Sequence, residues 1–284
     1  FIEATAYMRQ NSYDNYYGMT LMESNNNIPN WNKAQHILEK YKNIHIEYGS
    51  DKKGDLYNHK NLEYCKKKYK NSMDVITADG GFDFSHDYNN QEICAFRLIF
   101  TQIGYALTMQ KFNGHFILKI FDMFEKSTLD ILFLLSCFYE KVIISKPSTS
   151  RSANSEKYVI CKHFKYRNTE DITVRFINIL KIFQTLDFNK YNINSILDIP
   201  INNYYKTQLF EINACITHCQ IENILNTIKI ITHKDKKYDK IQHLKSMNIQ
   251  KCVKWCIENK IQHNTYFQNS NIFLGERIKN INKF

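Results

Sequence analysis

The chain has 284 residues, of which 43% are hydrophobic and 23% charged, so it can bury a large core and is too apolar for a disordered chain. Its 3 prolines, its 8 glycines and the shortness of its apolar runs exclude collagen-like, linker-rich and membrane-spanning classes, and we expect a soluble protein without a signal peptide. The net charge of +10 is compatible with a nucleic-acid partner without establishing one.

Residues 30–165 alternate short β-branched or aromatic runs with helical patterns, which is typical of βαβ units and a mostly parallel sheet. The expected strands are 44–48, 74–78, 115–121, 141–145 and 157–163. The expected helices between them are 61–69, 90–110 and 127–139. The last two strands are joined by a loop too short for a crossover helix, so they should be antiparallel. The predicted fold class is therefore α/β, with one antiparallel strand in the edge region of the sheet.

After about residue 168 the pattern becomes helical. Apolar side chains recur at intervals of three and four between Ile172 and Phe183, and further helices are expected at 208–231 and 239–259. Residues 229–284 hold 12 basic and 4 acidic side chains, so most of the excess charge lies in the last fifth of the chain. We predict two domains, an α/β domain over residues 1–165 and a helical, basic extension over 166–284.

Eight cysteines without a CxxC pair argue against a disulfide framework and favour a reducing compartment. Some of them have spacings that zinc ligands can adopt, namely Cys215, His218 and Cys219, followed by Cys252 and Cys256. Spacings of three and four also place side chains on one helical face, so helix packing is the preferred interpretation and no metal site is predicted.

Three charged residues lie near strand ends, where open α/β sheets bind their ligands. Asp79 follows one expected strand, and Glu156 precedes another. Lys119 interrupts an apolar run in a strand expected to be buried on both faces. A turn carboxylate, a surface glutamate and a snorkelling lysine are the ordinary explanations. Because a buried lysine is rare unless it is paired, Lys119 is the strongest functional candidate of the three.

Three segments carry a resemblance to a known family: ITADGGFDFS (76–85), GHFILKIFDMF (114–124) and KPSTSRSANSEKYVICK (146–162). With YYGMTL (16–21) and YGSDKKGDL (48–56), they resemble the motifs of the FtsJ/RrmJ-like ribose 2′-O-methyltransferases. The third is most similar to the eukaryotic and viral type that methylates the first transcribed nucleotide of capped mRNA. Several ordered motifs with matching spacing are far more specific than one short pattern.

The resemblance implies a Rossmann-like methyltransferase sheet, S-adenosylmethionine as cofactor and a Lys-Asp-Lys-Glu catalytic tetrad. Asp79, Lys119 and Glu156 match its second, third and fourth members. A ribose hydroxyl is a poor nucleophile at neutral pH, so the site must orient it and remove its proton. A desolvated lysine can act as that base, while the carboxylates orient the ammonium and the hydroxyl.

Binding residues are also implied by the resemblance. The cofactor contacts would be Asp55, Leu56, Phe1, Ile2 and Glu3, although a surface turn is the alternative explanation for Asp55. The RNA contacts would be Asn89, Asn90, Gln91 and Asn154. Uncharged amides suit hydrogen bonding to sugar hydroxyls and base edges, which is how proteins distinguish RNA from DNA.

The family pattern is incomplete in this sequence, because the glycines of the cofactor loop, the first strand and the first lysine of the tetrad would lie upstream of Phe1. We therefore expect a preceding segment. The expected function is methyl transfer from S-adenosylmethionine to a ribose 2′-hydroxyl of capped mRNA. The alternatives are a ribosomal or transfer RNA 2′-O-methyltransferase and a non-catalytic RNA-binding subunit with the same fold.

The expected partners are the capped 5′ end of mRNA and, through the basic extension, other capping or transcription proteins, with no membrane partner. Heavy use of Asn, Lys, Ile and Tyr is typical of an AT-rich genome. Together with the resemblance, this favours a large cytoplasmic DNA virus. The expected location is the viral factory in the host cytoplasm, with the virion as a second location.

Overall fold

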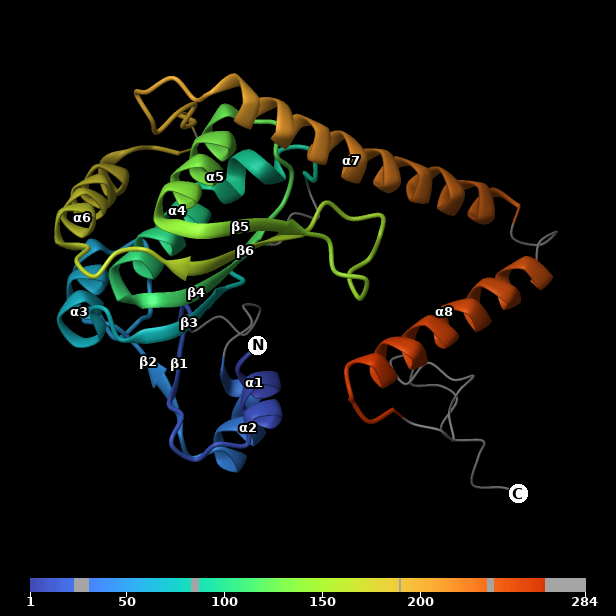
Figure 1. Cartoon of the computed structure of the whole chain (residues 1–284), viewed down its shortest axis with the longest axis horizontal. Coiled ribbons are helices and arrows are strands. Elements are labelled where there is room, and N and C mark those ends of the chain that lie inside the picture. The colour runs from blue at the N-terminus through green and yellow to red at the C-terminus, as the bar shows by residue number, and fades with distance from the viewer. Residues whose placement is uncertain (23–30, 83–86, 189, 234–237, 264–284) are drawn as a thin grey trace. The chain divides into compact units, whose positions relative to one another are not determined.

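Figure 1 shows the computed structural model of the chain, which describes residues 1–22, 31–82, 87–188, 190–233 and 238–263. Packing divides the chain into two compact units. The first comprises residues 1–147 and 155–216, and the second comprises 148–154 and 217–284. None of the helices in the described ranges combines the length and the apolar character needed to cross a membrane.

The first unit holds most of the secondary structure. In chain order its elements are α1 (Ile2–Arg9), β1 (Tyr16–Met19), the 3-10 helix η1 (Trp31–Ala34), α2 (Gln35–Lys40), β2 (Ile44–Glu47), α3 (His59–Tyr69), β3 (Met73–Ala78), α4 (Gln91–Met109), β4 (Gln110–Ile120), α5 (Lys126–Phe138), β5 (Tyr139–Ser145), β6 (Lys157–Phe164) and α6 (Glu170–Thr185). Helix α7 (Asn203–Thr232) begins in the first unit and continues into the second, which also contains α8 (Tyr238–Glu258). The strand and helix pattern expected for residues 44–163 is confirmed, whereas α1, β1 and the two short helices before β2 were not expected.

The main sheet has the strand order β3-β4-β6-β5. Strands β3 and β4 are parallel, and β6 is antiparallel to both of its neighbours. The expected antiparallel pairing of β5 with β6 is confirmed, and the reversed strand lies second from the edge of the sheet. Strands β3, β4 and β5 therefore end at one edge, and β6 begins there. Strands β1 and β2 form a separate parallel pair.

Strand β4 corrects one expectation. The side chains of Phe116, Leu118 and Ile120 are buried in the core, but Ile117 and Lys119 on the other face are only partly buried. An uninterrupted apolar run usually indicates a strand covered on both faces, and that interpretation of β4 is wrong. Because side chains alternate along a strand, Lys119 points to the open face.

Helix α6 continues the first unit beyond the predicted boundary at residue 165, because Phe176 and Leu180 are buried in the same core as Phe116 and Leu118. Helix α6 approaches α4 closely at Gly104. A Cβ atom at Gly104 would lie 2.6 Å from the ring of Phe176, so only glycine fits there. In packing terms, α6 is thus a component of the α/β unit.

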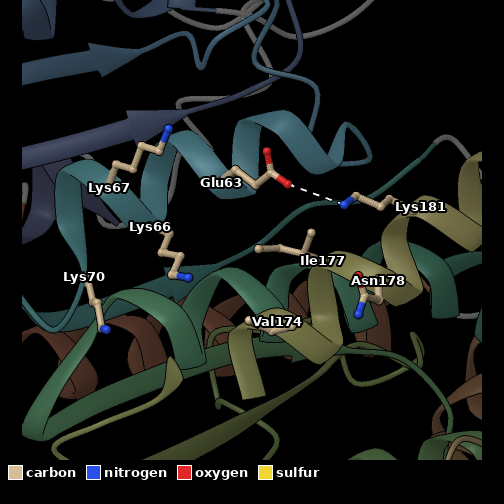
Figure 2. A pocket seen from close by; sticks show the side chains of 8 residues that line it. All are labelled: Glu63, Lys66, Lys67, Lys70, Val174, Ile177, Asn178 and Lys181. Atoms are coloured by element: carbon tan, nitrogen blue, oxygen red, sulfur yellow. Dashed lines mark ion pairs between the residues drawn. The ribbon is translucent and has the colours of Figure 1, made fainter. Parts of the chain in front are cut away.

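A groove between α3 and α6 is lined by four lysines, three of which pair with carboxylates of these two helices (Figure 2). Its lining residues are Glu63, Lys66, Lys67, Lys70, Val174, Ile177, Asn178 and Lys181. Lys66 and Lys70 both pair with Glu170, which lowers the pKa of that carboxyl to about 2, and Lys181 lies 3.7 Å from Glu63 across the groove. These contacts join the two helices, so the groove is best explained as a packing seam. Because α3 leads directly into the start of β3, Lys70 lies far from the edge where the strands end.

A buried carboxylate fixes the segment that leads from α6 to α7. Asp130 of α5 has a fully buried side chain, and it accepts hydrogen bonds from Ser195 Oγ at 2.6 Å, Ile196 N at 2.9 Å and Leu197 N at 3.2 Å. Burial alone would raise the pKa of Asp130, but these hydrogen bonds outweigh it and hold the pKa below its ordinary value.

We expect Asp130→Asn to lower the free energy of unfolding by about 2–3 kcal/mol, because the variant loses the negative charge whose Oδ2 accepts three hydrogen bonds and lies 3.3 Å from Lys126 Nζ. Since the folded-state pKa of Asp130 is depressed, its stabilising effect is present above the unfolded-state pKa and is lost as the pH falls through the folded-state value. The difference between wild type and variant should be constant above about pH 5 and shrink below about pH 4. Urea denaturation across this range measures it, with Asp198→Asn, an exposed carboxylate of the same segment, as control.

Candidate active site

Asp79 and Lys119 form an ion pair at the edge where the strands end. Asp79 directly follows β3 and Lys119 is the penultimate residue of β4, and the parallel register that pairs Ala78 with Leu118 brings them side by side. Lys119 Nζ lies 2.7 Å from Asp79 Oδ1 and donates to the Asp79 carbonyl oxygen at 3.1 Å. The Lys119 side chain is 15% exposed and that of Asp79 is 44% exposed. A partly desolvated ammonium is thus held by a carboxylate that solvent can reach.

Glu156 joins this pair through Tyr158. Glu156 directly precedes β6, and the antiparallel register places Tyr158 opposite Lys119 on the same face of the sheet. Tyr158 Oη donates to Glu156 Oε1 at 3.3 Å. Burial and the nearby carboxylates of Asp79 and Glu156 raise the pKa of Tyr158, so its hydroxyl remains a neutral donor. The structure therefore gathers the three predicted tetrad members around one tyrosine.

Tyr158 was not singled out in the sequence, although a signal for it exists. A side chain two residues beyond Glu156 must share its face of the strand, and the expected pairing of neighbouring strands could have placed it near Lys119. Phe1 lies beside Tyr158, with its ring edge-on to that of Tyr158 at 6.1 Å between the ring centroids. Of the other two residues at the chain start, Ile2 is partly buried and Glu3 is exposed.

The predicted adenosyl contacts lie on a rigid loop that follows β2. Buried Asn61 accepts hydrogen bonds from Ser50 N and Asp51 N and donates to the Asp55 carbonyl oxygen at 2.8 Å. Gly54 has a φ of +67°, and a Cβ atom there would lie 2.1 Å from the Thr20 carbonyl oxygen. This role of Asn61 could not be predicted from the sequence, because its partners are backbone groups of a loop whose shape no local pattern shows.

Asp55 and Leu56 supply the side chains of the loop that were predicted to contact an adenosyl group. Asp55 Oδ1 accepts from Tyr57 N at 2.8 Å, and within the described residues Asp55 Oδ2 has no hydrogen-bond partner. Leu56 is partly buried against the core. A free carboxylate oxygen beside an apolar side chain can accept from an exocyclic amine and cover a ring face. The donor and acceptor chemistry of these residues is therefore compatible with adenine.

The predicted RNA contacts divide between the two units. Asn89 and Asn90 are exposed in the turn before α4, where Asn90 Nδ2 donates to Asp87 Oδ2 at 2.6 Å. Gln91 Oε1 accepts from Ser155 Oγ at 2.9 Å, which brings the start of α4 next to Glu156. Asn154 belongs to the second unit, where its Oδ1 accepts from Ser150 Oγ at 3.4 Å. Gln91 is thus a predicted RNA contact that lies beside the residue preceding Glu156.

The cysteine and histidine residues with zinc-like spacing lie along helices. Cys215, Cys219 and Cys252 are free and exposed, and Cys256 is partly exposed. In the ranges that the structure describes, no three His, Cys, Asp or Glu side chains are grouped so that they could hold a metal ion.

The region that carries these features matches a family model. The model of the FtsJ-like methyltransferase family covers residues 6–164, which is more than half of the chain. The chain belongs to the FtsJ-like methyltransferase family. Its FtsJ-like region includes Asp79, Lys119, Glu156 and Tyr158, and it ends at the close of β6.

The chain is also similar to curated relatives. Cap-specific mRNA (nucleoside-2′-O-)-methyltransferase 1 of Mus musculus is 31% identical over 204 residues, which cover 63% of this chain and 24% of the relative. The Homo sapiens protein of the same name is 35% identical over 155 residues, which cover 52% of this chain and 18% of the relative. Cap-specific mRNA (nucleoside-2′-O-)-methyltransferase 2 of Drosophila melanogaster is 37% identical over 103 residues, which cover 36% of this chain and 15% of the relative. The chain therefore matches about a quarter or less of each relative's length.

A solved structure of a ribosomal RNA methyltransferase from Plasmodium falciparum is similar to 58% of this chain and 96% of that chain. The sequence identity is 16% and the TM-score is 0.36, so this likeness supports no conclusion about substrate.

Proposed function

We propose that the FtsJ-like region transfers a methyl group from S-adenosylmethionine to the ribose 2′-hydroxyl of the first transcribed nucleotide of capped mRNA. The observation that carries the proposal is the cluster of Asp79, Lys119 and Glu156 around Tyr158. The names of the relatives, which are cap-specific mRNA methyltransferases, support the choice of substrate.

Lys119 is the residue that acts on the hydroxyl. In its neutral form Nζ accepts the hydroxyl proton, and Asp79 Oδ1, at 2.7 Å, stabilises the ammonium that results. Glu156, whose Oε1 accepts from Tyr158 Oη, orients the ribose from the other side of the cluster. The Asp79 side chain is 44% exposed, so the pair is accessible from solvent on the carboxylate side.

S-adenosylmethionine, when bound, supplies an electrophilic methyl group. Asp55 and Leu56 would hold its adenosyl end, and Phe1 and Ile2 would lie beside it at the entrance to the cluster. Asn61 keeps the Asp55 loop in shape by binding three of its backbone groups, so the protein preorganises this contact before the cofactor binds.

Amide side chains would hold the RNA. Asn89, Asn90 and Gln91 precede or open α4, and Asn154 lies in the loop between β5 and β6. Their neutral donors and acceptors suit sugar hydroxyls and base edges, while the basic residues of 229–284 suit phosphates or an acidic partner protein. The AT-rich coding bias extends the proposal to a viral enzyme that works in the host cytoplasm.

Methyl transfer to matched RNAs tests the proposal. The purified protein is given radiolabelled S-adenosylmethionine with a capped RNA, the same RNA uncapped, and the same capped RNA already 2′-O-methylated at its first nucleotide. We expect labelling of the first RNA to exceed that of the other two by at least about 10-fold. The uncapped RNA lacks the cap contacts, and a tenfold preference corresponds to about 1.4 kcal/mol. The premethylated RNA has no free 2′-hydroxyl at its first nucleotide. Equal labelling of uncapped RNA would contradict the cap assignment. Absence of labelling with all three RNAs, despite RNA binding, would indicate a non-catalytic subunit.

A further inference from the structure

A second lysine lies next to the catalytic cluster and is completely buried. Lys157, the first residue of β6, has a side chain that is 0% exposed. Its Nζ donates to the Ser155 carbonyl oxygen at 2.9 Å and the Phe121 carbonyl oxygen at 3.0 Å, and it lies 3.4 Å from Asp122 Oδ1. Burial lowers the pKa of Lys157, and Asp122 opposes this shift. The ammonium therefore has an acceptor for each of its three hydrogens.

These acceptors belong to the chain segments that carry Lys119 and Glu156, two of the three proposed catalytic residues. Phe121 and Asp122 follow β4 two and three residues after Lys119, and Ser155 directly precedes Glu156. In the antiparallel register Lys157 is opposite Ile120, so its side chain lies on the buried face of the sheet, the reverse of the face that carries Lys119 and Tyr158. Lys157 thus joins both segments from behind the site.

Glu92 anchors the same loop to α4. Its buried carboxylate accepts hydrogen bonds from Phe124 N at 3.0 Å and from Glu125 N at 3.0 Å. The residue before it, Gln91, accepts from Ser155 Oγ. The segment that begins β6 is therefore fixed by one polar network that includes the end of β4 and the start of α4.

Stability alone does not account for a buried lysine. Removing an ammonium from water is costly, and replacing buried charges by apolar side chains often leaves stability unchanged or increases it. A single group that binds two carbonyls and a carboxylate does, however, fix three backbone positions relative to one another. An active site requires backbone positions to be fixed in this way, because a small displacement of the reacting groups slows the reaction.

We infer that Lys157 is a positioning residue that holds Glu156 in place relative to Lys119 by binding the Ser155 carbonyl and the Phe121–Asp122 segment from the buried face. The inference rests on the proposed function. Lys157 does not touch the reacting atoms, so it acts through Glu156.

The test combines Lys157→Met with Glu156→Gln in a double-mutant cycle of methyl transfer. We expect Lys157→Met to lower kcat by about 10–100-fold, with KM for RNA changed by less than about threefold. Because Lys157 acts through Glu156, the double variant should be no slower than the slower single variant. Lys162→Met, an exposed lysine on the same strand, is the matched control and should keep wild-type kcat. An unchanged kcat in Lys157→Met, or losses that multiply in the double variant, would overturn the inference.

A second variant and a second measurement keep the test decisive. If Lys157→Met does not fold, Asp122→Asn weakens the same contact while leaving both carbonyl partners, and the same coupling with Glu156→Gln is expected. Amide hydrogen exchange at residues 156–159 should accelerate in Lys157→Met and not in Lys162→Met. If the wild-type protein transfers no methyl group, the proposed function fails, and unchanged exchange in Lys157→Met would separately refute the positioning role.

Discussion

Replacing Lys119 with methionine is expected to lower the rate of methyl transfer by about 10³-fold or more while the protein remains folded. Lys119 Nζ is the group held at 2.7 Å from Asp79 on the open face of β4, and methionine keeps the length and apolar body of the side chain without a nitrogen. Single-turnover transfer to capped RNA at saturating cofactor measures the chemical step. Thermal unfolding shows whether the fold is retained.

Lys111 provides the matched control for this variant, because it lies on the same strand and pairs with a carboxylate of the neighbouring strand, Asp74, at 2.9 Å. That pair is exposed at the opposite end of β4, so Lys111→Met should leave the rate within about twofold, as expected for an exposed ion pair away from the site. A Lys119→Met protein within about 10-fold of wild type would refute the proton-acceptor role.

Replacing Asp79 with asparagine should slow methyl transfer by about 10²-fold. The amide can still accept a hydrogen bond from Lys119 Nζ, and the carbonyl contact at 3.1 Å is unaffected, so the lysine stays in position. What is lost is the negative charge that stabilises the ammonium formed when the hydroxyl is deprotonated. Affinity for RNA and cofactor should change little, which binding measurements on the same preparation can establish.

Asp74→Asn is the corresponding control, since it removes a carboxylate of the same strand that pairs with an exposed lysine. A loss smaller than about threefold in Asp79→Asn would show that the charge of Asp79 does not contribute to the chemical step. A loss of RNA affinity equal to the loss of rate would instead assign Asp79 to substrate binding.

The sequence predicted those parts of the fold that depend on local pattern. Short β-branched or aromatic runs located β3, β5 and β6 within one or two residues, whereas β4 begins at Gln110, well before its expected start at residue 115. The short connection between β5 and β6 required their antiparallel pairing, which the register confirms. The spacing of Asp79, Lys119 and Glu156 followed from the family motifs, and the structure brings all three to one edge of the sheet. Their catalytic roles remain predictions that the variants above test.

Features that depend on contacts between distant segments could not be predicted. Burial of each face of β4 depends on which elements pack against it. The apolar run around Lys119 therefore led to the wrong prediction that both faces of this strand are buried. Asn61 and Lys157 bind mainly backbone carbonyl or amide groups, and these carry no sequence signature. Both residues appear in the sequence as ordinary surface types, one at the start of an expected helix and the other beside Glu156, and only the folded chain shows that they are buried.

The reversed direction of β6 determines which insertions and deletions the site can tolerate. Five residue pairs lock β6 to β4, and Glu156 reaches the site because it immediately precedes this ladder. A change in the length of the 148–153 connection leaves the ladder, and hence Glu156, where it is. Deleting one residue within β6 would instead exchange its two faces, turning Tyr158 toward the core and Lys157 toward the face that carries Lys119. Length variation among homologous sequences should therefore stop abruptly at Ser155.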